Sequence, residues 1–161
     1  MKEVAILLLA ALLLNGCGSS NSSTTTQTAA GNTWQAEMLG GEGTASGFSF
    51  ITQFTVGGDG TLSISYFQFL NSNSAQCFPV SGGTQTGQAI LQINSSTNGV
   101  TGTLTYNVQS GGNTLTLNGT SVTGTESGNT LTGGSVTGTW TLTGGTGCND
   151  STGGSFTMNQ H

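Results

Sequence analysis

The chain has 161 residues and a net charge of −5 at pH 7, and Lys2 is its only Lys or Arg. Sites for nucleic acids, nucleotides and anionic lipids depend on Lys and Arg, so this composition excludes those partners. Its 28 glycines and many threonines are typical of disordered chains, but its apolar residues are regularly spaced. Regular spacing favours a packed β domain.

The N-terminal segment predicts export. A short charged start precedes an unbroken apolar run from Val4 to Leu14, which is typical of a secretory signal and too short to span a bilayer. The sequence Leu14-Asn15-Gly16-Cys17 that follows resembles the lipobox of bacterial lipoproteins. This resemblance implies a signal peptide over 1–16, cleavage before Cys17, and a diacylglycerol on the Cys17 thiol that anchors the protein to a membrane.

The segment 17–31 is polar, uncharged and of low complexity. Such a composition buries no apolar area, so we expect a flexible tether between the lipid on Cys17 and a single domain over 32–161. The residue after the cysteine is Gly18, whereas a retention signal for the inner membrane has Asp at this position. In a cell with two membranes, the resemblance therefore implies anchoring to the outer membrane, with either face of that membrane possible.

Apolar and polar residues alternate with a period of two along the rest of the chain, and no segment has a helical period. Between the strands, turn signals occur at 57–60, 97–99, 110–113 and 127–129. The strands predicted by this alternation are 33–39, 47–56, 61–70, 87–94, 99–108, 113–119, 120–126, 130–143 (as one strand or two) and 153–159.

These eight or nine strands predict an all-β fold, an antiparallel meander that closes as an up-and-down barrel and so removes exposed edges. A two-sheet β-sandwich remains the alternative. Long loops are expected at 71–86 and 144–154. Within the repeated Val-Thr-Gly-Thr motif, Gly102, Gly124 and Gly138 share the inward phase. A glycine at such a position allows the strand to bend and a ring to lie against the backbone, and the alternative is a cavity for a ligand.

The cysteines predict one disulfide. If Cys17 carries lipid, as the resemblance implies, Cys77 and Cys148 remain as a pair in an oxidising compartment. A bond between them would join the two long loops and stabilise the fold by about 4 kcal/mol. Metal binding is the poorer interpretation, because no His lies near either cysteine and two thiolates make an incomplete zinc site.

The sequence carries little catalytic chemistry. The only histidine, His161, is terminal and offers no credible base for a Ser-His-Asp or Cys-His arrangement. The carboxylate pairs Glu37 with Glu42 and Glu126 with Asp150 lack a spacing that favours glycoside hydrolysis. Asp59 and Asp150 lie in loops that match no calcium motif, so both are interpreted as turn residues. We therefore expect no enzyme activity, no cofactor and no metal site.

Two functions remain. The first is a non-catalytic structural or interaction module of the cell envelope, anchored by lipid. The second is a binding protein for a small neutral ligand, either an apolar molecule inside the barrel or a sugar on an aromatic face. The candidate ligand-binding residues for the second function are Trp34, Tyr66, Tyr106 and Trp140.

In outline the predicted barrel resembles lipocalin and avidin-type barrels, although the chain has no diagnostic motif of either. Geometry separates the hypotheses. A ligand inside the barrel requires a cavity of about 300 Å³ or more, beside rings that are not fully buried. Two aromatic rings on a shared exposed face would favour a sugar.

Overall fold

The computed structural model describes residues 27–28, 33–40, 47–71, 77–128, 130–144, 148 and 153–161. The predicted signal peptide, Cys17 and most of the predicted tether lie outside these ranges. Within them, no helix is long and apolar enough to cross a membrane. The strands are β1 (Gln27–Thr28), β2 (Trp34–Leu39), β3 (Ser49–Val56), β4 (Leu62–Phe69), β5 (Thr84–Asn94), β6 (Gly99–Ser110), β7 (Asn113–Ser127), β8 (Thr130–Thr143) and β9 (Gly153–Gln160).

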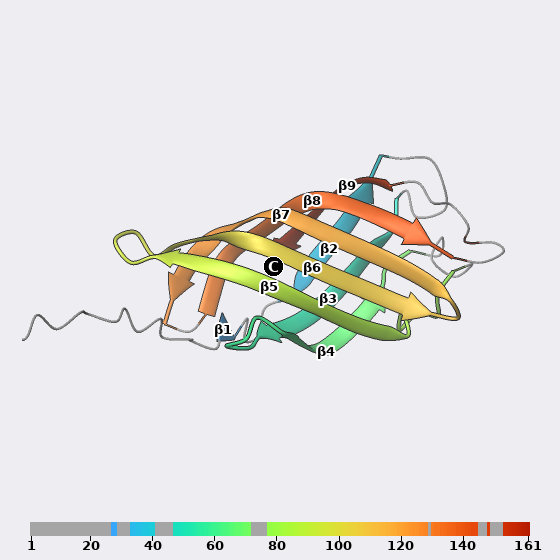
Figure 1. Ribbon diagram of the computed structural model, residues 1–161, viewed down its shortest axis with the longest axis horizontal. Coiled ribbons are helices and arrows are strands. Elements are labelled where there is room, and N and C mark those ends of the chain that lie inside the picture. Colours follow the sequence, from blue (N-terminus) through green and yellow to red (C-terminus); the bar gives the residue numbers. More distant parts are fainter. Residues whose placement is uncertain are drawn as a thin grey trace, which may run out of the picture.

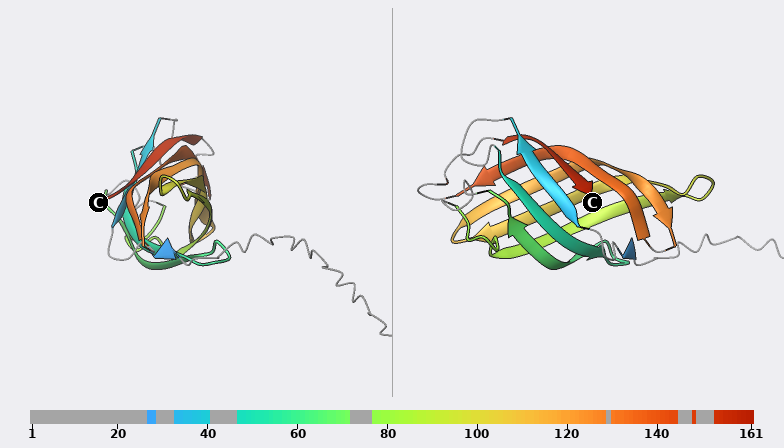
Figure 2. Two further views of the ribbon diagram at one scale, coloured as in Figure 1. Left: turned by 90° about the vertical axis from the view of Figure 1, so that its left-hand side faces the viewer. Right: turned by 180° about the vertical axis from the view of Figure 1, so that it is seen from behind.

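All these strands belong to one antiparallel sheet that curls into a nearly closed barrel (Figures 1 and 2). Around the barrel the order is β4-β3-β2-β9-β8-β7-β6-β5, so from β2 to β9 each strand pairs with its neighbours in the chain, except that β4 and β5 do not pair with each other. In addition, β2 pairs with the last strand, β9. The short β1 pairs with the end of β3. The prediction of an up-and-down antiparallel barrel is therefore confirmed, and the two-sheet alternative is not adopted.

The barrel is left incomplete between β4 and β5, and we call this place the β4–β5 seam. The two strands meet at a single bridge between Thr61 and Gln88, beside which the Ala89 N–H donates to the Gly60 carbonyl at 2.8 Å. Near the other end, the Phe69 N–H donates to the Val80 carbonyl at 3.0 Å. Between these points the described residues form no ladder.

Side chains fill the inner side of the seam where the ladder is missing. A Cβ on Gly82 would lie 2.5 Å from the Phe67 ring, and a Cβ on Gly87 would lie 2.6 Å from Leu62 Cδ1. The two glycines thus lie directly beneath two large side chains of β4. This packing closes the apolar interior without closing the hydrogen-bonded sheet.

The strand bounds differ from the predictions mainly at β7 and β5. The segments 113–119 and 120–126 form one continuous strand, β7, because the change of phase between them is a bulge at Gly119/Ser121 rather than a turn. β4 also contains a bulge, opposite Gln53 and Phe54. β5 begins at Thr84, three residues before its predicted start, and the segment 130–143 does not split.

The repeated glycines lie where the strands bend. Register shifts occur beside Gly102 and Gly124, and Gly138 pairs with the bulged segment of β7. A Cβ on Gly138 would collide with the Asn118 carbonyl oxygen. The two tryptophan rings lie instead over two other glycines, with Trp34 against Gly134 and Trp140 against Gly154.

The inward positions of the strands form one apolar core that is rich in aromatic rings. Phe50 is central, because its ring packs against Phe67, Phe69 and Tyr106 with centroids 4.8 to 6.1 Å apart. The outward positions of β5 to β9 carry mainly Thr, Ser, Asn and Gln.

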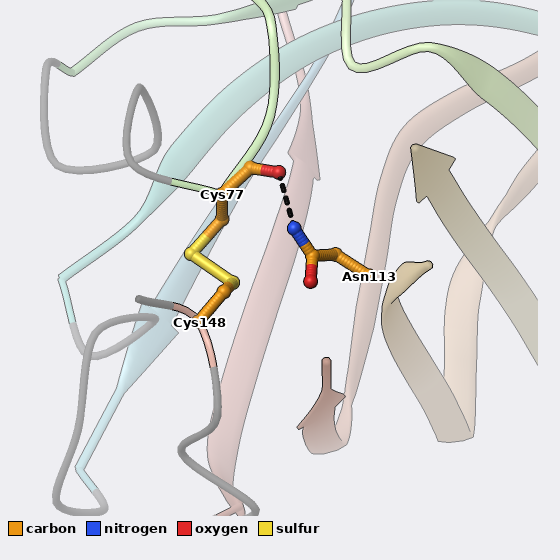
Figure 3. The surroundings of a disulfide bond; sticks show 3 residues. All are labelled: Cys77, Asn113 and Cys148. Atoms are coloured by element: carbon orange, nitrogen blue, oxygen red, sulfur yellow. Dashed lines mark hydrogen bonds between the residues drawn. A yellow bond between two sulfur atoms is a disulfide. The ribbon is translucent and has the colours of Figure 1, made fainter. Parts of the chain in front are cut away.

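The predicted disulfide between Cys77 and Cys148 is present (Figure 3). It joins the β4–β5 connection to the β8–β9 connection, with 5.2 Å between the two Cα atoms. Asn113 Nδ2 donates to the Cys77 carbonyl at 2.7 Å, which ties the bridged segment to the start of β7. The bond therefore lies at the barrel end opposite the β5–β6 turn.

Candidate functional site

The aromatic residues predicted to bind a ligand are mostly part of the core. Trp34, Tyr106 and Trp140 are 2%, 0% and 1% exposed, whereas Tyr66 is 40% exposed on the outer face of β4. Tyr66 donates a hydrogen bond to Gln68 on its own strand. No other Trp, Tyr or Phe of the described residues is as exposed, so the structure brings no second ring beside Tyr66 to complete a sugar-stacking face.

The Tyr106 hydroxyl has a buried partner that sequence reasoning missed. Thr52 Oγ1 lies 2.8 Å from the Tyr106 hydroxyl and donates to the Tyr66 carbonyl at 2.9 Å. Because the single Thr52 hydroxyl proton is used in that bond, the Tyr106 O–H donates to Thr52. This chain of hydrogen bonds satisfies each of its members, as expected for a structural group in a dry interior. The sequence carried one indication of this arrangement. Thr52 lies between Phe50 and Phe54 and, like them, occupies an inward-facing position of its strand.

We expect the stability of the fold to fall above about pH 10. Burial raises the pKa of Tyr106 far above its usual value of about 10, and the hydrogen bond with Thr52 offsets this only in part. In the unfolded chain the phenol ionises near pH 10, so the stabilisation is complete below that pH and is lost as the pH rises further. Urea unfolding between pH 8 and pH 11 measures this loss. The decline should be much weaker in Tyr106→Phe, and an equal decline in that variant would contradict the assignment.

The barrel interior has an apolar recess, which we call the mouth recess. It lies at the end where the β5–β6 hairpin turns (left in Figure 1) and has a free volume of about 20 Å³. This is enough for about one water-sized group and far below the roughly 300 Å³ of a typical ligand site. Its lining consists of Trp34, Phe54, Val56, Ala89, Leu91, Leu104, Val122, Leu131 and Val136. This recess is therefore too small to hold a whole small-molecule ligand.

A larger hollow lies on the outer face at the β4–β5 seam, and we call it the seam hollow. Its volume is about 410 Å³. It is lined by Thr61, Thr86, Gly87, Gln88, Thr105 and Asn107. Every side chain in this lining is uncharged and hydrogen-bonding, except that of Gly87, which leaves its backbone accessible. Sequence reasoning missed this site, because its residues lie in three separate segments.

Two features orient the hydrogen-bonding groups of the seam hollow. Thr116 Oγ1 donates to Asn107 Oδ1 at 2.9 Å, which leaves the Asn107 NH₂ group to donate elsewhere. Ala89 directs its N–H toward β4, and residues two apart in a strand direct their backbone groups to the same side. Gly87 therefore directs its N–H and C=O into the seam. The hollow thus offers both side-chain and backbone donors and acceptors.

Asp59, which lies beside the seam hollow, has a structural role. Asp59 Oδ1 accepts from the Thr61 N–H at 2.9 Å, and Oδ2 accepts from Thr61 Oγ1 at 3.0 Å. These hydrogen bonds lower the pKa of Asp59 and close the turn between β3 and β4. Among the described residues, no three His, Cys, Asp or Glu side chains gather as a metal site would require. Glu42 and Asp150 lie outside the described ranges, as does Cys17.

No protein-family model, curated protein or solved structure matches this chain.

Proposed function

We propose that the protein is a non-catalytic interaction module of the cell envelope, anchored through lipid on Cys17. The lipobox-like sequence before Cys17 and the polar segment after it support the anchoring. The barrel is well suited to presenting a rigid outer surface, because its apolar interior is packed and a disulfide crosslinks one end.

We infer the class of partner from the chemistry of the seam hollow. Its lining offers hydroxyl, amide and backbone groups without any charge. An anionic partner would find no cation there, and an apolar partner would leave these polar groups without hydrogen bonds. An uncharged chain rich in hydroxyl groups suits both the size and the chemistry of the hollow. The partner class that we propose is therefore a neutral glycan bound on the outer face, not a molecule inside the barrel.

Titration with neutral oligosaccharides tests this binding. The probes are hexamers of glucose and of N-acetylglucosamine, added to ¹⁵N-labelled protein with the change Cys17→Ser. We expect the amide signals of Gly87, Gln88 and Thr105 to shift, with dissociation constants in the high micromolar to millimolar range. Asn107→Ala should weaken binding at least tenfold, because it removes the best-oriented donor.

Thr139→Ala is the matched control for this titration, because Thr139 is an exposed outward residue on β8, away from the seam. It should leave the affinity unchanged. The glycan proposal is wrong if neither hexamer shifts any seam residue, or if the two variants bind equally well.

Anchoring is tested separately by feeding an alkyne-labelled fatty acid to bacteria that express the full chain. The label should be incorporated into the wild-type protein, which should fractionate with the envelope, and it should be absent from Cys17→Ser. An unlabelled wild-type protein would refute the anchor without affecting the glycan test.

A further inference from the structure

One edge of β5 is unpaired where the strand runs past the β3–β4 turn. The Ala89 N–H still reaches this turn, where it donates to the Gly60 carbonyl at 2.8 Å. Residues two apart in a strand direct their backbone groups to the same side, so Leu91 and Ile93 direct theirs to this edge. No described residue pairs with them there. The segment 90–94, which we call the free edge, therefore presents open backbone donors and acceptors.

The other side of β5 is fully used by β6. Every residue of β5 pairs with β6 in one unbroken register, up to Asn94 opposite Gly99. The Ile90 carbonyl oxygen lies beside Gly102 of β6, which confirms that the even-numbered residues face that strand. Figure 1 shows the β5–β6 hairpin projecting beyond the neighbouring labelled strands. The free edge is therefore open to another molecule.

The free edge lacks the devices that usually keep strand edges from pairing. Natural edge strands are protected by charged side chains, proline, bulges or short length. β5 is 11 residues long and contains no Asp, Glu, Lys, Arg or Pro, and its register has no bulge. Its two edge-directed residues are apolar, with Leu91 partly buried against the core and Ile93 38% exposed. An edge of this kind is a template for a further strand.

We propose that the free edge pairs with the same edge of a second copy of this chain, antiparallel about a two-fold axis at Gln92. The free edge ends at the β3–β4 turn on one side and at the β5–β6 turn on the other. Antiparallel pairing about Gln92 therefore matches the segment 90–94 with itself. Leu91 of each copy lies opposite Ile93 of the other, and each such pair exchanges two backbone hydrogen bonds, about four in all.

Charge and symmetry favour a second copy as the occupant. Neither β5 nor β6 carries a charged residue, so two copies meet without repulsion between like charges. A two-fold contact uses the free edge of both copies at once, so it yields a closed dimer rather than a filament. The contact is short, and we therefore expect a weak dimer. None of the residues 90–94 lines the seam hollow, so the dimer does not depend on the proposed glycan.

A cysteine crosslink tests the register of the dimer. In protein with Cys17→Ser, Gln92→Cys would place the two introduced thiols opposite each other in a pair without hydrogen bonds, where side chains lie closest. Oxidised glutathione should therefore join two copies by a disulfide. Thr101→Cys is the matched control, because Thr101 is exposed and pairs with Gln92 but lies one strand farther from the edge. It should crosslink at least tenfold more slowly, and equal rates would overturn the proposal.

Sedimentation equilibrium gives a second measurement. Protein with Cys17→Ser should form dimers in the high micromolar range. Ile93→Pro should weaken the dimer at least tenfold and leave the barrel folded, because the Ile93 N–H faces the free edge, where proline is tolerated. Ile93→Ala keeps this N–H and should weaken the dimer less.

Near-ultraviolet circular dichroism checks that these variants are folded. A protein that stays monomeric at every concentration would overturn the proposal and leave the free edge to a strand of another protein. A dimer that persists unchanged in Ile93→Pro would also overturn it, because the contact would then lie elsewhere. If Ile93→Pro does not fold, the crosslinking of Gln92→Cys decides the matter.

Discussion

Removal of the Cys77–Cys148 disulfide is expected to lower the free energy of unfolding by about 4 kcal/mol, because the bond restricts a long loop in the unfolded chain. The two cysteines are 71 residues apart in sequence. Domains of this size are typically stable by only about 5–15 kcal/mol, so a loss of this size is a large fraction of the total. Urea unfolding of Cys77→Ala/Cys148→Ala, in protein with Cys17→Ser, measures it.

Cys17→Ser alone is the control for the disulfide variant, because it removes a cysteine without touching the bond. Its unfolding midpoint should equal that of the protein with Cys17 intact, and reducing agent should lower the midpoint only where Cys77 and Cys148 are both present. A double variant as stable as its control, or two reactive thiols in the unreduced folded protein, would show that the bond does not hold the two connections together.

Phe50→Ala is expected to cost about 3–5 kcal/mol, the usual loss when a buried aromatic ring is deleted and a cavity remains. Phe50 is 0% exposed and packs against Phe67, Phe69 and Tyr106. Its matched control is Ile90→Ala, which deletes a large apolar side chain that is 70% exposed on the outer face of β5. That change should alter stability by no more than about 0.5 kcal/mol.

The comparison of these two variants tests which face of the strands points inward. Urea unfolding should give a difference of several kcal/mol between Phe50→Ala and Ile90→Ala. Equal losses would mean that the sheet has no single apolar face, and the barrel assignment would then be wrong.

Much of the fold could be predicted from the sequence, because side chains in a strand alternate between two faces and only one face of this sheet is apolar. Alternation located strands such as the one predicted over 47–56, and Gly-rich turns such as 57–60 separated them. Alternation failed at β7, because an extra residue near Ser121 moves the apolar side chains from odd to even positions or the reverse. The start of a new strand after a turn would produce the same change. A local pattern does not distinguish a bulge from a turn.

The candidate sites were less accessible to sequence reasoning, because each depends on register between distant strands. Thr61 and Gln88 meet only because β4 and β5 close the barrel. No local sequence pattern indicates that these two strands meet without a ladder of hydrogen bonds. Trp34 was selected as a binding residue on account of its ring, but its unpaired N–H became evident only once the neighbours of the ring were known. The pairing of the cysteines could be predicted without knowing the register between strands, so the Cys77–Cys148 disulfide could be predicted.

Amide hydrogen exchange of the native protein, resolved by residue, tests most directly whether the barrel is closed everywhere except at the β4–β5 seam. The Gly87 and Phe67 N–H groups face the seam without a ladder and should exchange orders of magnitude faster than that of Leu117, which lies in β7 between two paired strands. Ala89, whose N–H donates to Gly60, should be protected. Protection of Gly87 equal to that of Leu117 would mean that β4 and β5 form a continuous ladder, and it would contradict the seam on which the proposed function rests.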